Sequence, residues 1–218
     1  MTHIKTLFIA ALSALIITAS PAAKAYPPSV VGGAPMQPGT AHNIGLGWPS
    51  IMYEWWHSGV PDWALGAELV YGDWSGAFSD MTIGLGLNAP FRFHLATNGR
   101  ADFALRIAPG VLIADAHDSH EDIFVLGLRG EFAMPVSVGI SPKVNLITGL
   151  AAPVAVYIPE HGDTIFVFPI LIRLGVEFLP QQPYLPWLLV EVGPTIGHRS
   201  GHTEVDPGFR IWIGTTIW

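Results

Sequence analysis

The sequence predicts an all-β protein, a transmembrane antiparallel up-and-down β-barrel of ten strands. Between turn signals the chain alternates in segments of about ten residues, as membrane strands do. In each segment one parity is almost purely apolar, and the eleven charges that we place inside the strands fall on the other parity; in residues 165–178, for example, Arg173 and Glu177 are both odd-numbered. A soluble barrel would bury the apolar face. This pattern therefore indicates hydrocarbon outside the barrel and a polar interior.

The chain divides into three expected segments. Residues 1–25 have the layout of a cleavable signal peptide, with an apolar run over residues 7–19 and small residues at 23–25. That run is shorter than the roughly 20 residues of a membrane-spanning helix. Residues 26–38 form a short N-terminal segment, and residues 39–218 form the barrel. The sequence has no cysteine, so disulfides, a lipid-modified cysteine and thiolate-bound metals are excluded.

Composition supports strands rather than helices as the membrane elements. Half of the residues are apolar and 12% are charged, which is typical of a membrane protein. After residue 25, however, Gly, Pro or a charge interrupts every apolar run before it reaches the length of a spanning helix. Hydrophobicity in short segments separated by turn residues is the pattern of a membrane β-barrel.

The turn signals place the ten strands at 39–48, 50–57, 63–73, 81–95, 102–114, 122–140, 143–158, 165–178, 187–197 and 209–218. An alternative is an eight-stranded barrel in which residues 26–59 form an extension or a plug. Four prolines lie toward one end of consecutive strands and remove backbone donors: Pro109, Pro153, Pro169 and Pro194. We expect bulges or a splayed rim there, or an open sheet if these strands are edges.

The last strand ends on an aromatic residue, in the segment Phe209-Arg-Ile-Trp-Ile-Gly-Thr-Thr-Ile-Trp218. It resembles the carboxy-terminal insertion signal of bacterial outer-membrane β-barrel proteins, although Trp218 shares the parity of Arg210 rather than that of the apolar face. The resemblance to this superfamily is architectural and covers residues 26–218. It implies a monomer in the outer membrane of a Gram-negative cell envelope, contacting outer-membrane lipids and lipopolysaccharide and recognised by the barrel-assembly machinery through its last strand.

The connections predict two different rims. Turns at 58–62, 97–100, 141–142 and 180–186 are nearly neutral, whereas those at 73–80, 115–121, 159–164 and 198–206 carry acids and histidines. Trp218 belongs to the neutral rim, which the resemblance assigns to the periplasm. The eight tryptophans cluster near predicted strand ends and are expected to form aromatic girdles at the membrane interfaces.

Five acids and six bases are predicted to face the lumen. They are Glu54, Glu68, Glu131, Glu177, Glu191, Arg92, Arg106, Arg129, Lys143, Arg173 and Arg210. Interleaved signs allow pairing in a space that would penalise an isolated charge. The charges therefore predict either a structural network that fills the lumen or a narrow, porin-like channel. Ten strands leave too little room for a wide pore.

Other chemistry is weaker. His117 and His120, with flanking carboxylates, could bind zinc or copper, completed by a further histidine from another loop; a flexible acidic loop is the alternative. The rim segments 198–200 and 202–204 contain the Ser and His that a lipid acylhydrolase or acyltransferase would use, but adjacency along the chain does not establish a catalytic pair. We therefore expect no enzyme, no cofactor and, for this acidic chain, no nucleic-acid partner.

Overall fold

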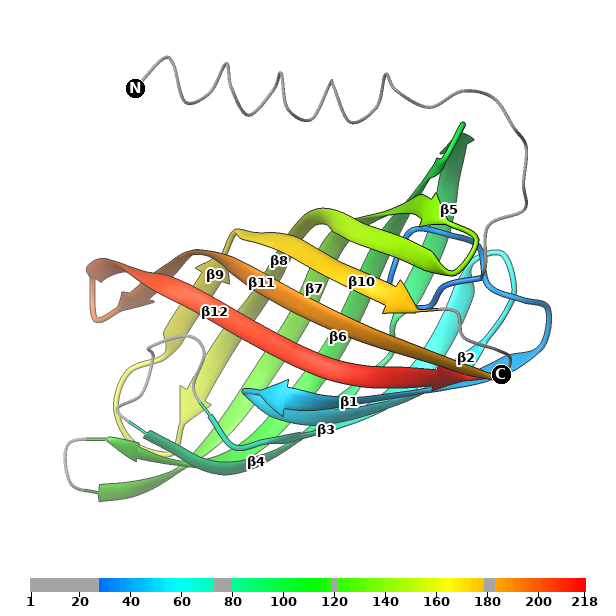
Figure 1. Cartoon of the computed structure of the whole chain (residues 1–218). Coiled ribbons are helices and arrows are strands. Elements are labelled where there is room, and N and C mark those ends of the chain that lie inside the picture. The colour runs from blue at the N-terminus through cyan, green and yellow to red at the C-terminus, as the bar shows by residue number, and fades with distance from the viewer. Residues whose placement is uncertain (1–27, 73–79, 119–120, 179–182) are drawn as a thin grey trace, which may run out of the picture.

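A computed structural model describes residues 28–72, 80–118, 121–178 and 183–218, which form one closed antiparallel barrel (Figure 1). The strands are β1 (Thr40–Trp48), β2 (Ser50–His57), β3 (Asp62–Val70), β4 (Asp80–Asn88), β5 (Phe91–Asn98), β6 (Ala101–Asp118), β7 (Glu121–Ser141), β8 (Val144–Pro159), β9 (Ile165–Pro169), β10 (Leu171–Phe178), β11 (Tyr184–Arg199) and β12 (His202–Ile217). No helix among the described residues is long and apolar enough to span a membrane.

The barrel has ten strand positions, as predicted. Two positions are each divided: β4 and β5 both pair with β3 and β6, and β9 and β10 both pair with β8 and β11. The ring closes where β12 pairs with β1. The alternatives of an eight-stranded barrel and of an open sheet are therefore wrong, because residues 40–57 form two wall strands and each position has a partner on both sides.

The register sets the dimensions of the barrel. Paired residues can be followed once around the ring, from Thr215 of β12 through Ile44 of β1 and onward to His198 of β11, which pairs with Thr203 of β12. The path returns to β12 twelve residues from its start. With strands about 4.7 Å apart and a rise of about 3.3 Å per residue, this stagger corresponds to a tilt of about 40° and a backbone radius of about 10 Å.

The outer face is apolar around the ring. Leu65, Leu87, Leu174 and Ile213 are between 51% and 63% exposed, and they belong to four different strands. On β9 and β10 the exposed or half-exposed side chains run at every second position from Phe166 to Phe178. At a tilt of about 40°, those thirteen residues cover about 30 Å along the barrel axis.

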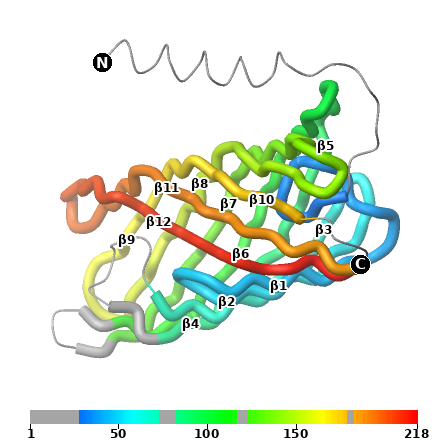
Figure 2. The backbone as a smooth tube through the Cα atoms, in the orientation of Figure 1, coloured from blue at the N-terminus to red at the C-terminus, as the bar shows by residue number. Residues whose placement is uncertain are grey.

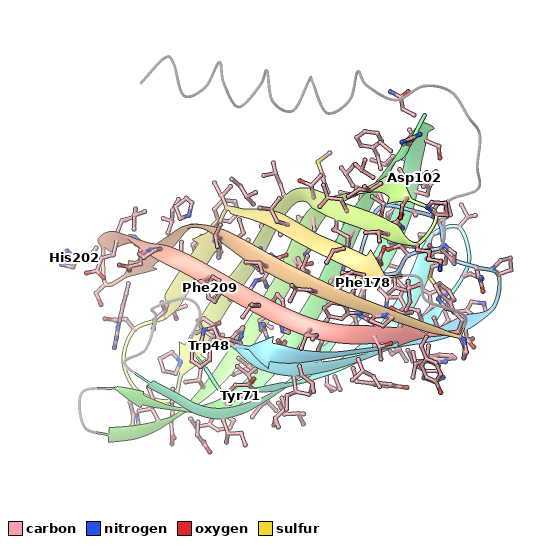
Figure 3. All side chains as sticks on the ribbon, viewed as in Figure 1. Trp48, Tyr71, Asp102, Phe178, His202 and Phe209 are labelled. Carbon is pink, nitrogen blue, oxygen red and sulfur yellow. The ribbon has the colours of Figure 1, made fainter. Side chains whose placement is uncertain are left out.

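The two ends of the barrel differ. Figure 2 shows the first described residues and the C-terminus at the same end, and Figure 3 places Asp102 near that end and His202 at the opposite one. At the His202 end, two hairpins are longer than predicted, because pairing continues to Asp118↔Glu121 and to Arg199↔His202. The described residues 115–118, 121, 198–199 and 202–206 are thus strand rather than the loops that we expected.

Prolines interrupt the wall without opening it. The predicted strand 165–178 is split at Ile170, directly after Pro169, and the predicted strand 81–95 is split at Ala89 and Pro90. Register shifts occur at three other sites, Met81/Ile83, His94/Ala96 and Gly139/Ser141. The expectation of a distorted wall near the prolines thus holds for Pro169.

The interior has three layers. At the end that holds the C-terminus, a cluster of buried side chains joins Val30 and Met36 of the N-terminal segment to Trp56, and Trp218 packs against it. Paired charges occupy the middle of the lumen. Toward the His202 end the inward side chains are apolar, and they form the largest buried cluster: Val70, Leu112, Ala114, Ala116, Ile123, Val125, Ala155, Tyr157, Ile165 and Val167.

Candidate functional site

The middle layer of the lumen is an ion network centred on Glu131. This carboxylate lies 3.2 Å from Arg173 Nη2, 3.3 Å from Arg210 Nη2 and 3.7 Å from Arg106 Nε. Glu131 and Arg210 are 79 residues apart in the chain, on β7 and β12. The tilt and stagger of the strands bring their inward side chains to the same level.

Two further acids complete this network. Glu191 accepts from Arg173 Nε at 2.6 Å and also pairs with Arg210. Both contacts join facing residues of neighbouring strands, since Glu191 pairs with Arg173 across β10 and β11 and with Arg210 across β11 and β12. Glu54 pairs with Arg106. Register alone therefore accounts for part of the network.

A separate ion pair lies beside this network. Arg129 Nη1 is 2.8 Å from Glu68 Oε2, and Glu68 also accepts from Ser50 Oγ. Counting both groups, four arginines face four glutamates, so the described middle layer has no net charge. Charges removed from water are tolerated only when they are paired and hydrogen-bonded in this way.

Aromatic side chains fill the space between the charged groups. Trp56 is fully buried, with the guanidinium groups of Arg92 and Arg106 at 5.8 and 5.7 Å from its ring centroid. Its Nε1 donates to Glu54 at 2.9 Å. Arg210 lies 5.1 Å from the ring of Trp212. These contacts are attractive and need little water, which suits a narrow lumen.

The expectation that all eight tryptophans form interfacial girdles is wrong for three of them. Trp56, Trp187 and Trp212 are buried inside the barrel, where Trp187 Nε1 donates to Asn43 Oδ1 at 2.9 Å. Inward parity decides this placement, because a strand-end residue can face either side. Trp55 and Trp63 do stack edge to face near one rim at 5.6 Å, and Trp48 contacts Tyr71 near the other at 6.2 Å. Trp74 lies outside the described residues.

The N-terminal segment plugs one end of the lumen. Residues 29–34 are buried, and Ser29 Oγ donates to Glu177 Oε1 at 2.5 Å. The N–H groups of Gly33 and Ala34 both donate to Ser137 Oγ, at 2.9 and 3.3 Å. A Cβ at Gly33 would clash with the carbonyl oxygen of Asp102, so only glycine fits at position 33 of this segment. We refer to residues 29–34 as the plug.

Arg92 holds the plug from the opposite side. Its Nη1 donates to the carbonyl oxygens of Ser29 and Gly32, and its Nη2 lies 2.9 Å from Asp62 Oδ2. Of the predicted lumen charges, Arg92 and Glu177 therefore bind the plug rather than the central network. Glu177 also accepts from Asn145 Nδ2 at 3.5 Å. Lys143 lies exposed in the turn between β7 and β8, outside the lumen.

A small cavity lies between the plug and the ion network. Its volume is about 90 Å³, room for roughly half a dozen water molecules. Val31 of the plug lines it together with Glu131, Arg173, Trp212 and Pro153, and with other lumen residues. The lumen is thus not completely filled by side chains.

The weaker sequence candidates do not assemble into sites among the described residues. His120 lies outside them, His117 is described only as part of β6, and no group of three or more His, Asp or Glu side chains there could hold a metal ion. At the rim, Ser200 Oγ donates to Asp163, whereas His198 Nδ1 shares a hydrogen bond with Thr203 Oγ1 at 3.0 Å. The two candidate catalytic groups therefore take different partners.

Several site residues were not predicted. Asp62, Ser29, Ser137 and Asn43 are all buried and anchor the plug or a lumen tryptophan. Only their inward parity signals Asn43 and Ser137, because uncharged polar residues occur on both faces of a strand. Ser29 lies in a segment without periodicity, which carries no such signal.

These features define the protein as a closed ten-stranded β-barrel with a plugged, charge-paired lumen. No protein-family model, curated protein or solved structure matches the chain.

Proposed function

We propose that this protein is an integral β-barrel of the bacterial outer membrane, with a lumen that is closed to free diffusion. One observation carries the proposal: the exposed face of the wall is apolar between the two rims, while four arginines and four glutamates of the strands are paired inside. In water such a wall would lose the burial of large apolar side chains around its whole circumference. In a bilayer it needs no further partner.

The dimensions support the same environment. An apolar band of about 30 Å matches the hydrocarbon core of a bilayer, and a strand tilt of about 40° is that of membrane barrels. The end that holds the C-terminus and the plug would face the periplasm, and the long hairpins would face outward. In this orientation the hairpins would meet lipopolysaccharide, and β12 would be the strand that the assembly machinery recognises.

The lumen supports a structural role rather than a wide pore. The plug closes one end, four Arg–Glu pairs cross the middle, and an apolar cluster occupies the rest. A narrow water pathway is a second candidate, because a cavity of about 90 Å³, lined partly by charged residues of the ion network, lies beside the plug.

Heat-dependent migration on denaturing gels, together with membrane fractionation, tests the barrel proposal. We expect the unheated protein to migrate differently from the heated one and to sediment with outer membranes. Recovery in the soluble fraction with no migration shift would refute the proposal. Planar bilayer recordings then separate the two lumen functions: a closed barrel passes no steady current, whereas a narrow channel gives a resolved single-channel conductance.

A further inference from the structure

One seam in the wall lacks both hydrogen bonds of a facing residue pair. β8 pairs Ala155 with Val167 and Ala151 with Leu171, so Pro153 stands opposite Pro169 between them. Proline has no N–H and cannot donate. The paired ladder resumes on both sides of this position, which makes the defect local.

The direction of the backbone groups shows that both prolines face the seam. Glu160 N donates to Phe124 O of β7, so the backbone N–H and C=O groups of even-numbered β8 residues point toward β7. The backbone groups of Pro153 therefore point toward β9. Ile170 N donates to Pro194 O of β11, so Pro169 points toward β8. The carbonyl group of each proline therefore faces the ring nitrogen of the other proline, which has no hydrogen to donate.

The other side of the same strand is also weakened. Ile170 N donates a hydrogen bond to Pro194 O, but Pro194 has no N–H that could donate to the carbonyl oxygen of Ile170. By contrast, the break opposite Pro109 keeps a bond from Ala89 N and involves one missing donor only. The seam between Pro153 and Pro169 is thus the weakest point of the two.

The seam lies at the level of the apolar belt. Ile170, next to it, is 45% exposed on the outer face and lies between the exposed Phe166 and Leu174. In hydrocarbon each unpaired backbone carbonyl raises the free energy of the folded state, so two of them at this level lower the stability of the wall. Pro153 and Pro169 are themselves buried, and the pairs on both sides of them, Ala155↔Val167 and Ala151↔Leu171, keep the seam closed in this structure.

Behind the seam the lumen is apolar and then becomes polar. Ala133, Ala151 and Leu171 form a buried cluster on its inner side. Pro153 also lines the 90 Å³ cavity, and so do Arg173 and Trp212. Arg173 follows Ile170 by three residues in the divided strand β9–β10, which is a distance of about 10 Å in an extended chain.

Two buried donors in this cavity lack acceptors. Arg173 Nη1 and Trp212 Nε1 have no hydrogen-bond partner among the described residues. Arg173 is 2% exposed and Trp212 is 6% exposed. Buried N–H groups of this kind normally have a partner. An oxygen atom at the end of an apolar chain would supply one, with the chain passing the small apolar residues toward the seam.

We propose that the wall opens laterally between β8 and the β9–β10 position, and that it admits a single alkyl chain whose terminal oxygen accepts hydrogen bonds from Arg173 and Trp212. The class of ligand is a fatty acid or its ester. The proposal rests on the proposed membrane location, because the seam faces the hydrocarbon belt. It adds a binding site and an entry route to what is otherwise a closed barrel.

Photo-crosslinking tests the seam in the full-length protein folded into phosphatidylcholine vesicles. The probe is palmitic acid with a diazirine on its chain, and labelled residues are located by mass spectrometry. We expect labels on the inward residues Ala133, Ala151 or Leu171 as well as on the outer face. Labels confined to the outer face would refute the proposal.

A matched pair of variants separates the seam from general lipid contact. Pro153→Ala with Pro169→Ala restores two donors, and we expect inward labelling to fall at least fivefold while outer-face labelling stays constant. Pro109→Ala, which restores one donor elsewhere, should leave inward labelling unchanged. Equal inward labelling in the double variant would overturn the route. Heat-dependent migration of each sample tests the barrel separately, so failure of the seam leaves the membrane proposal standing.

Three probes test the head-group contact. Palmitic acid and methyl palmitate both carry an acceptor oxygen, whereas hexadecane with the same diazirine carries none. We expect inward labelling by the acid, the ester or both, and at least tenfold less inward labelling by the hydrocarbon. The ratio of inward labelling by acid and by ester shows whether the protein binds the free acid or its ester. Equal labelling by all three would remove Arg173 and Trp212 from the site.

Discussion

Replacing Glu131 by glutamine removes the charge at the centre of the lumen network with little change in shape. Glu131 accepts from Arg173 and Arg210 at 3.2 and 3.3 Å and lies 3.7 Å from Arg106. Glutamine keeps one carbonyl oxygen, so at most one of these hydrogen bonds survives, and it becomes a weaker one. The variant would also leave the lumen with one unbalanced positive charge.

The expected loss of stability follows from these contacts. Breaking a buried ion pair from one side costs about 3–5 kcal/mol, and a hydrogen bond to a charged group contributes about 1.5–3 kcal/mol. The Glu131 side chain is 17% exposed, and it borders a cavity that can hold water, so the lower end applies. We expect the free energy of unfolding of Glu131→Gln to fall by about 3 kcal/mol.

Equilibrium urea unfolding of vesicle-inserted protein, followed by tryptophan fluorescence, measures this change. Lys143→Gln is the control, because Lys143 is an exposed turn residue, and its effect should stay within about 0.5 kcal/mol. A loss below about 1 kcal/mol for Glu131→Gln would show that water screens the network, and the reasoning about buried pairing would fail.

Two further outcomes are expected. Gly33→Val should unseat the plug, because its side chain would meet the Asp102 carbonyl, whereas Gly197→Val, where an added Cβ meets nothing within 4 Å, should leave the plug in place. Reaction of a cysteine introduced by Val31→Cys with a water-soluble maleimide measures this; equal protection in both backgrounds would contradict the plug. Leu174→Arg, on the outer belt, should lower stability by about 2–4 kcal/mol in urea titrations of vesicle-inserted protein, and Thr203→Arg, on the exposed hairpin, by less than about 1 kcal/mol. Equal costs at the two positions would argue against a membrane-embedded belt.

The alternation of side chains predicted most of the wall. A strand has a period of two, so the placement of charges on one parity decides which face is inward for each segment. Ten strand positions and both rims follow from this pattern and the turn residues. The pattern could not show that the hairpins continue past residues 115 and 198, because paired strands outside the belt carry polar side chains on both faces and look like loops.

Parity also predicted the lumen charges, but it did not predict their partners. Glu191 meets Arg173 and Arg210 through direct pairing of neighbouring strands, which a correct register alone would show. Glu131 meets Arg210 across the lumen, a contact that depends on the tilt of every strand between them. Lys143 has the parity of the inward residues and still lies outside the lumen, because it belongs to the turn between the end of β7 and the start of β8.

The amino-acid sequence alone therefore decided the class of fold and the two faces of the wall, since both depend on local periodicity. The choice between ten and eight strands needed the pairing of β1 with β12 and with β2. Closure, the twelve-residue stagger and the resulting charge pairs belong to the tertiary structure, because they depend on how ten registers add around a ring. The plug and the proline seam belong there too. A segment without periodicity gives no sign of where it will lie, and two prolines become a defect only when the fold sets them face to face.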